Sequence, residues 1–143
     1  MNNSDTVSTA ALAYLGDSVI EVCVRTYLVE NGLSSSSRLN EKALEFVRAS
    51  RQAEAVKRIL PMLTEDEAAI FRRGRNIGHT NTPKSSTVSE YRMATGMEAL
   101  FGWLHLNGMT DRIDLLFKEA YGIDRRLAAG VCESSDASEI TQK

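Results

Sequence analysis

This 143-residue sequence lacks any apolar run that approaches the roughly 20 residues that a membrane-spanning helix needs. Its N-terminal residues 1–9 are polar and hold no basic group followed by an apolar stretch, so we expect no secretory signal peptide. Both absences predict a cytoplasmic protein with no membrane partner. Only two prolines and nine glycines interrupt the chain, which leaves room for long helices.

Cysteine is equally scarce, with Cys23 and Cys132 as its two instances. Cys23 lies next to valines and near Ile20, which is a core-like context, whereas Cys132 lies in a polar tail. We expect no disulfide between them, and neither shows the spacing of metal ligands.

The net charge of −2 is unevenly distributed along the chain. Residues 38–92 carry eleven basic and seven acidic side chains, a net of +4, whereas residues 1–37 and 93–143 each carry −3. A basic middle segment can form a localised positive face. The same charges can also solvate ordinary helices, and charge alone favours that plainer interpretation.

Apolar residues recur at three- and four-residue steps, which predicts an all-α fold of about six helices. We find no internal repeat and no convincing strand. The predicted helices span about 9–30, 38–47, 51–60, 65–76, 88–106 and 111–121.

Capping residues and turn signals support these boundaries. The expected N-caps are Ser8 or Thr9, one of Ser34 to Ser37, Thr64 and Thr110, and the expected helix ends are Asn31-Gly32 and Asn107-Gly108. Residues 77–87 read as a polar loop, and the sequence loses its periodicity from about residue 127.

Two carboxylates stand in strongly apolar helical surroundings. Asp17 lies in the run LAYLGDSV at residues 12–19, and Glu98 lies in MEALFGW at residues 97–103. An isolated buried carboxylate is costly, so such groups are usually paired, hydrogen-bonded or bound to a metal. Two of them buried in one small domain would indicate helices that meet around a divalent cation, and hence a metal-dependent hydrolase.

The first helix also fits a plainer interpretation. Asp17, Glu21 and Arg25 are spaced four residues apart and form one polar stripe on an otherwise apolar rod. Such a stripe can simply face solvent, with Glu21 and Arg25 as an ordinary ion pair. This helix alone leaves both interpretations open.

The fifth helix favours the metal site, because Glu98 is its one carboxylate after Glu90. Mg²⁺ prefers oxygen ligands and keeps several waters, so two carboxylates and a substrate phosphate suffice to hold it. Thr95 lies one turn before Glu98, and His105 lies two turns after it, where a solvated or capping role is favoured over a ligand role. Small residues on this helix permit close approach of a neighbour: Ala94, Gly96, Ala99 and Gly102.

A basic run, RRGRN at residues 72–76, precedes a polar loop that ends near Lys84. Arginine, lysine, asparagine, serine and threonine are the residues that contact nucleic-acid phosphates. A basic helix end that leads into a polar loop therefore suits a nucleic-acid backbone. Short basic clusters are common, however, and these arginines could instead pair with the acidic residues 65–67 of their own helix.

Two segments resemble the signature motifs of ribonuclease III endonuclease domains. The run at residues 12–19 is similar to L-E-F-L-G-D-[AS]-V, and TGMEALFG at residues 95–102 is similar to D-x-[FV]-E-A-x-x-G. The resemblance covers roughly residues 8–122. It implies the all-α ribonuclease III fold and a catalytic domain over residues 1–122, with residues 123–143 as a polar, disordered tail.

Two positions depart from these motifs, because Ala13 replaces the glutamate of the first and Thr95 replaces the aspartate of the second. Asp17 and Glu98 are then the two that remain of the family's four acidic residues. No double-stranded-RNA-binding domain follows in the sequence. This combination resembles Mini-ribonuclease III, the bacterial subclass made of the endonuclease domain alone.

The resemblance implies an obligate homodimer that cuts double-stranded RNA with Mg²⁺, for which Mn²⁺ can substitute. It implies the 23S ribosomal RNA precursor as substrate and a large-subunit ribosomal protein as an assisting partner. A non-catalytic scaffold that binds RNA or dimerises is the alternative. The expected roles are metal binding and catalysis for Asp17 and Glu98, orientation of water or ligands for Glu21 and Thr95, RNA contacts for Arg72, Arg73, Arg75, Asn76 and Lys84, and dimer contacts for Tyr14 and Leu15.

Overall fold

A computed structural model describes residues 6–77 and 87–123. Within these ranges it contains helices joined by short connections and no strand, which confirms the all-α prediction. No helix among the described residues has the length and apolarity to span a membrane. The elements are α1 (Thr9–Glu30), α2 (Ser36–Val47), α3 (Ala49–Ile59), the short 3₁₀ helix η2 (Leu60–Met62), α4 (Glu65–Arg75), α5 (Val88–Leu106) and α6 (Thr110–Ala120).

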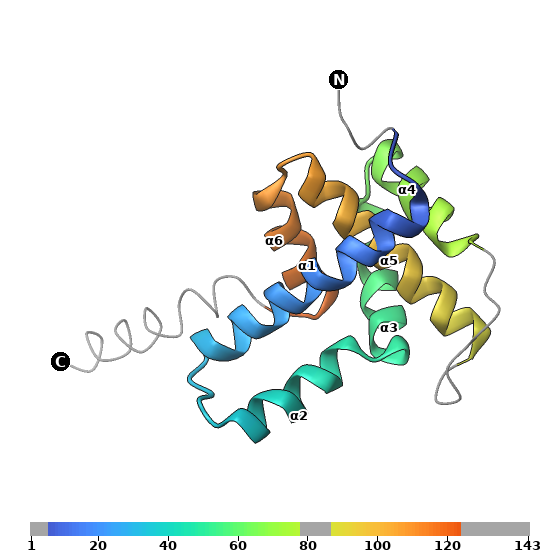
Figure 1. Ribbon diagram of the computed structural model, residues 1–143. Coiled ribbons are helices and arrows are strands. Elements are labelled where there is room, and N and C mark those ends of the chain that lie inside the picture. The colour runs from blue at the N-terminus through green and yellow to red at the C-terminus, as the bar shows by residue number, and fades with distance from the viewer. Residues whose placement is uncertain (1–5, 78–86, 124–143) are drawn as a thin grey trace.

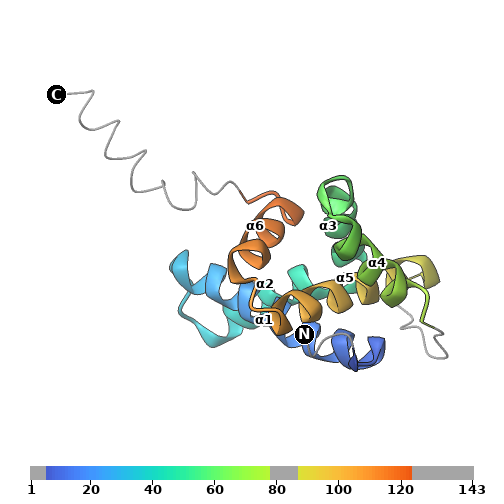
Figure 2. The same ribbon diagram turned by 90° about the horizontal axis from the view of Figure 1, so that it is seen from above.

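Helix α5 is the centre of the domain. Helix α1 crosses it on one side, while α3, α4 and α6 pack on the other (Figures 1 and 2). Nearly half of the residues of α5 are buried, including Met97, Leu100, Phe101 and Leu104. Because α5 is apolar around most of its circumference, it can be covered from several sides at once.

The local signals fixed most helix boundaries. The hydroxyl of Ser8 accepts a hydrogen bond from the Ala11 amide, and Thr64 forms a complete capping box with Glu67. Asn31 and Asn107 end their helices before glycines with positive φ, as predicted.

Three predicted helix starts were wrong. Helix α2 begins at Ser36, two residues before Arg38, and its N-cap Ser35 confirms a cap within the serine run. Helix α3 begins at Ala49, two residues before Arg51. Thr110 is the first residue of α6, and Met109 precedes it as a cap without a side-chain hydrogen bond.

The crossing of α1 with α5 is unusually close. A Cβ atom on Gly16 would overlap the backbone carbonyl oxygen of Glu98, and one on Gly102 would overlap the carbonyl oxygen of Leu12. The two helix backbones are therefore in direct contact at this point, which no residue larger than glycine permits. This contact sets the position of Asp17, the residue after Gly16.

A buried ion pair joins α4 and α6. Arg112 of α6 donates from Nε and Nη2 to the carboxylate of Glu67, with both distances 2.8 Å, and from Nη2 to the Met62 carbonyl oxygen at 2.8 Å. The Glu67 side chain is 1% exposed. Burial alone would raise the pKa of Glu67, but the hydrogen bonds from Arg112 and Thr64 and the charge of Arg112 hold it below its usual value.

Cys23 behaves as a core residue. It is partly buried on α1, and burial together with the negative charge of Asp114 raises the pKa of its thiol to about 11. The thiol is therefore neutral near pH 7 and a poor nucleophile. Cys132 and the predicted disordered tail lie outside the described residues, so the predictions for them stay predictions.

Candidate active site

Asp17 of α1 and Glu98 of α5 face one another across the close helix crossing. Their carboxyl groups are near enough to share a hydrogen bond. Burial of Glu98, followed by the negative charge of Asp17 and that hydrogen bond, raises the pKa of Glu98 to about 8. Near neutral pH Glu98 therefore largely keeps its proton unless a cation displaces it.

The burial expected for the two carboxylates was half right. Glu98 is partly buried, whereas Asp17 is exposed. The motif around Asp17 is apolar because Leu12, Gly16 and Val19 pack inward, while Asp17 projects from the edge of the helix crossing. The result is one anchored carboxylate beside one that is open to solvent and substrate.

Of the two residues expected to orient water or ligands, Glu21 lies one turn after Asp17 on α1. Its carboxylate accepts a hydrogen bond of 2.9 Å from Arg25 Nε, so the Glu21–Arg25 ion pair of the plainer interpretation is present. Arg25 thus orients the carboxylate of Glu21, and no ion pair between Arg25 and Asp17 is present among the described residues.

Thr95 is 8% exposed and donates from Oγ1 to the Tyr91 carbonyl oxygen at 2.9 Å. This bond holds the side chain against its own helix, as is common for threonine within helices. The hydroxyl oxygen keeps its acceptor capacity, but its proton is already engaged.

Oxygen donors of this kind suit a hard divalent cation. Two carboxylates repel one another, and a cation between them would remove the repulsion that raises the pKa of Glu98. Among the described residues, no group of three or more histidine, cysteine or acidic side chains could hold a metal ion. Asp17 and Glu98 would thus be its two protein ligands, which is enough for Mg²⁺ with waters and a substrate phosphate.

Comparison with known proteins identifies the family of this chain. The family model of the ribonuclease III domain matches residues 10–109, a span that includes both carboxylates. The chain belongs to the ribonuclease III family.

Individual relatives agree with this assignment. Mini-ribonuclease 3 of Desulfitobacterium hafniense is 44% identical over 115 residues, which cover 79% of this chain and 71% of that protein. Mini-ribonuclease 3 of Symbiobacterium thermophilum is 40% identical over 118 residues, covering 82% and 91%. A crystal structure of a Fusobacterium nucleatum protein matches with a TM-score of 0.71 and 32% identity, covering 78% of this chain and 88% of the other.

These findings confirm the predicted family, its all-α fold and the activity class of a ribonuclease III-type endoribonuclease. The family uses a divalent metal and acts on double-stranded RNA.

The basic residues of this ribonuclease III domain are separated from Asp17 and gather at the end of α4. Arg72, Arg73 and Asn76 are exposed and Arg75 is partly buried. None of the three arginines pairs with a carboxylate in the described part of the chain, where Glu67 pairs with Arg112 instead. Lys84 lies outside the described residues.

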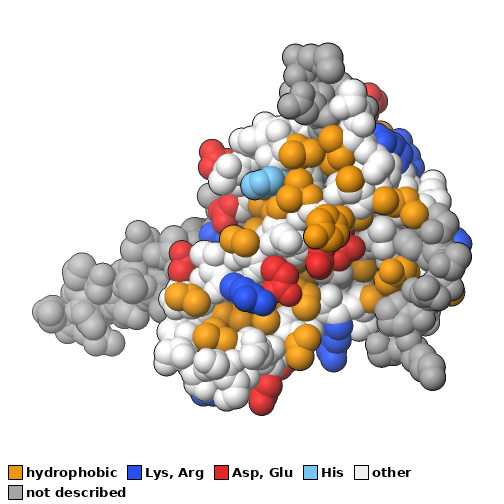
Figure 3. Space-filling model, in the orientation of Figure 1, with side chains coloured by type: hydrophobic (Ala, Val, Ile, Leu, Met, Phe, Trp, Pro, Cys, Tyr) orange, Lys and Arg blue, Asp and Glu red, His pale blue; other side chains and the backbone are white. Residues whose placement is uncertain are grey.

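The surface of α1 around Asp17 carries exposed apolar side chains. Tyr14 is 84% exposed, Val22 64% and Val29 60%, whereas Leu15 is partly buried. Figure 3 shows hydrophobic and acidic side chains next to one another over α1. Val22 belongs to the apolar residues that recur at three- and four-residue steps on this helix, but it is exposed because α1 packs on α5 along a different line of residues.

Sequence reasoning missed one basic residue near these elements. Arg92 lies one turn into α5 and shares a cavity with Arg75 and Asn76. It is an isolated basic residue near the start of a largely apolar helix, so a search for clusters of basic residues does not find it. Its helical position four residues after Val88, at the end of α5 that meets α4, was the available signal.

Proposed function

We propose that this chain is a Mg²⁺-dependent endoribonuclease that hydrolyses phosphodiester bonds of double-stranded RNA, with Mn²⁺ able to replace Mg²⁺. The observation that carries the proposal is the juxtaposition of Asp17 and Glu98 across the crossing of α1 with α5. A scaffold needs no such costly pair of carboxylates, whereas a metal-dependent nuclease does.

The two carboxylates have different parts in this mechanism. A bound Mg²⁺ would polarise the scissile phosphate and lower the pKa of a bound water. Glu98 is held by burial on α5 and fixes one side of the site, and exposed Asp17 is accessible from the side where substrate arrives. Glu21, held by Arg25, and the acceptor oxygen of Thr95 would orient waters around them.

The RNA duplex would be held mainly by the end of α4. Arg72, Arg73, Arg75 and Asn76 are charged or polar donors there, and Lys84 follows in the chain. A-form RNA is recognised largely through its shape, its phosphates and its 2′-hydroxyl groups, which suits arginines that have no carboxylate partner among the residues that the structure describes.

A homodimer through α1 would complete the enzyme. Tyr14 and Leu15 would contact the second copy, and the exposed Val22 and Val29 would extend this apolar surface along the same helix. Exposed apolar surface of this kind is typical of interfaces. Two copies would supply two Asp17–Glu98 pairs, and each pair would cut one strand of the duplex.

The proposed substrate in the cell is the precursor of 23S ribosomal RNA, trimmed at its ends in the cytoplasm with the help of a large-subunit ribosomal protein. The support is the similarity over most of the chain to proteins named Mini-ribonuclease 3. The test is primer extension on 23S ribosomal RNA from cells depleted of this protein, where longer ends are expected and unchanged ends would contradict the substrate.

The activity itself is tested with purified protein and long double-stranded RNA, in Mg²⁺ and in chelator. Cleavage to short duplexes in Mg²⁺, and none in chelator, is the expected result. Single-stranded RNA of the same sequence is the matched control and should remain uncut. A protein that binds the duplex, dimerises and never cuts it in Mg²⁺ or Mn²⁺ would be the scaffold instead.

A further inference from the structure

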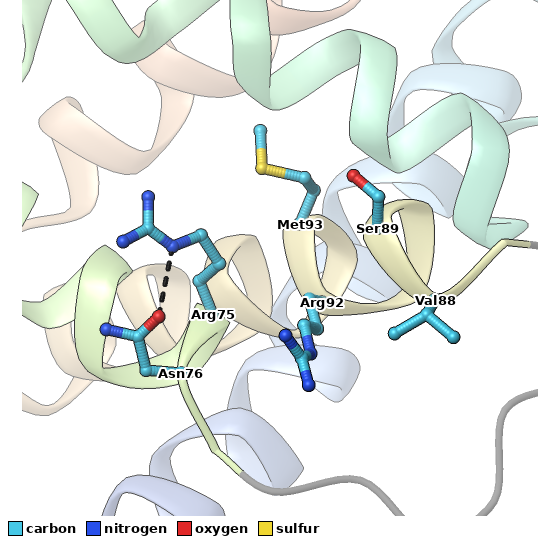
Figure 4. Close-up of a pocket in the computed structure, with 6 residues that line it drawn as sticks. All are labelled: Arg75, Asn76, Val88, Ser89, Arg92 and Met93. Carbon is cyan, nitrogen blue, oxygen red and sulfur yellow. Dashed lines mark hydrogen bonds between the residues drawn. The ribbon is translucent and has the colours of Figure 1, made fainter.

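A cavity of about 340 Å³ opens between the end of α4 and the first turns of α5, and none of its lining residues belongs to α1. Arg75 and Asn76 border it from α4, and Val88, Ser89, Arg92 and Met93 border it from α5 (Figure 4). Among the described residues, the lining thus holds two arginines, two neutral polar side chains and no carboxylate.

The positive charge of this cavity is not neutralised within the described part of the chain, where neither Arg75 nor Arg92 has a carboxylate partner. Glu90 is the acidic residue nearest to Arg92 in sequence, but its carboxylate accepts the Thr87 amide at 3.0 Å in the capping box of α5. Glu90 keeps its negative charge there, so the two guanidinium groups and this carboxylate leave a net charge of +1, which still favours an anion in the cavity.

Arg75 is held in place from two sides. Its Nε donates to Asn76 Oδ1 at 3.2 Å, and its guanidinium lies over the ring of buried Phe71 with 5.9 Å to the ring centroid. These contacts leave the two terminal amino groups without a partner among the described residues. A guanidinium presented in this way matches two oxygens of a phosphate.

The start of α5 adds partial positive charge to the same cavity. Val88 and Ser89 are the first two residues of this 19-residue helix, and their amides precede that of Glu90, which donates to Thr87 Oγ1 in the capping box. The Ser89 hydroxyl provides a further neutral donor at the lining. Arginine, a hydroxyl and helix-end amides are the donors that bind phosphate groups.

We propose that this cavity binds a backbone phosphate of the RNA substrate other than the scissile one, with Arg75 and Arg92 as its ligands. This inference rests on the proposed function and adds Arg92 to the RNA-binding residues.

Arg92 lies six residues before Glu98 on α5, about 9 Å along the helix axis at 1.5 Å per residue. The two residues also differ by about 240° around the helix axis at 3.6 residues per turn, so the cavity and the carboxylate pair are on different faces of α5 and would hold different phosphates of one extended duplex. Exposed Arg72 and Arg73 continue the positive surface on α4, which favours an extended polyanion over an isolated acidic peptide.

The experiment compares Arg92→Gln with the matched control Arg38→Gln, which removes the same charge from an exposed arginine of α2. Duplex RNA binding is measured in chelator, so that no cleavage occurs, over a series of salt concentrations. Arg92→Gln should raise Kd about five- to tenfold near ~0.1 M salt, and should reduce the slope of log K against log salt by about one. Arg38→Gln should change Kd less than about twofold. With Mg²⁺, most of the loss for Arg92→Gln should appear in KM.

Two results would overturn the inference. One is an Arg92→Gln variant whose Kd and salt slope equal those of Arg38→Gln. The other is a fall in kcat with an unchanged salt slope, which would place Arg92 in support of the catalytic centre. If Arg92→Gln unfolds, Arg92→Lys decides instead, because it keeps the charge but loses the two-pronged contact and should weaken binding while keeping the slope. Wild-type protein that binds the duplex but never cuts it would refute the proposed function and leave this comparison intact.

Discussion

Gly16 of α1 and Glu98 of α5 are in backbone contact, since a Cβ atom on Gly16 would overlap the Glu98 carbonyl oxygen. The atom that would be displaced belongs to the backbone of the central helix, so no flexible side chain can yield. This contact brings the neighbouring Asp17 next to the Glu98 carboxyl group. The geometry of the site therefore depends on a residue that takes no part in the chemistry.

Gly16→Ala should accordingly destabilise the domain and abolish cleavage together. Alanine favours a helix over glycine by up to about 1 kcal/mol, but the overlap with α5 should cost more, for a net loss of about 2 kcal/mol or more. Thermal unfolding and duplex cleavage are the measurements. Ser18→Ala, at an exposed position of the same helix, is the control and should change neither by much. Wild-type stability in Gly16→Ala would show that the helices can separate without loss.

Asp17→Asn and Glu98→Gln should each reduce cleavage at least about 100-fold while the domain stays folded, because each removes one of two ligands to the metal. Neither change should lower the melting temperature without metal at about pH 9, where Glu98 has lost its proton and each change relieves the repulsion between two carboxylates. Circular dichroism reports the fold and a gel assay reports cleavage. Near-wild-type cleavage by either variant would contradict the two-carboxylate site.

The metal-free protein should become less stable as pH rises from about 4.5 to about 8, the interval between the ordinary and the folded-state pKa of Glu98. Folding raises this pKa, so the folded state binds the proton more tightly and loses stability when the proton leaves. Relative to wild type, Glu98→Gln should gain on the order of 2 kcal/mol between about pH 5 and about pH 9, after allowance for solvent screening.

Urea denaturation at the two pH values measures this difference. Adding Mg²⁺ at the higher pH should stabilise wild type but not Glu98→Gln, because the cation replaces the lost proton only where both carboxylates are present. An equal pH dependence in the two proteins would mean that Glu98 ionises normally in the folded state.

Arg112→Leu should destabilise the fold by about 3–5 kcal/mol, because it leaves the carboxylate of Glu67 buried without its partner. The loss should be greatest near neutral pH and should shrink in acid. Folding lowers the pKa of Glu67, so its contribution is present above the unfolded pKa and disappears as pH falls through the folded one. Lys42→Ala, which removes an exposed ion pair of 3.7 Å with Glu45, is the control and should cost less than about 1 kcal/mol.

Tyr14→Lys should shift the proposed homodimer toward monomer by about tenfold or more in Kd, because it places a charge on the apolar surface of α1. Leu44→Lys makes the same change at an exposed apolar residue of α2, 65% exposed, and should leave dimerisation unaffected. Light scattering at micromolar concentration distinguishes the two. If both variants behave alike, α1 is not the interface.

The sequence by itself determined the helices and the two carboxylates. Helix periodicity and caps depend on neighbours within about four residues, so Ser8, Thr64 and the glycines after Asn31 and Asn107 marked boundaries without knowledge of the fold. The apolar run around Asp17 and the small residues around Glu98 were visible for the same reason, as was their similarity to ribonuclease III motifs.

Tertiary structure alone decided how these parts meet. Asp17 and Glu98 are 81 residues apart in sequence, and their contact exists because two glycines let α1 and α5 touch. The exposure of Asp17 and Val22 depends on which line of α1 packs against α5, and the cavity of Arg75 and Arg92 depends on how α4 meets α5. Such contacts follow from the packing of complete helices, because local hydrogen bonds and periodicity contain no information about the neighbour that each helix face will meet.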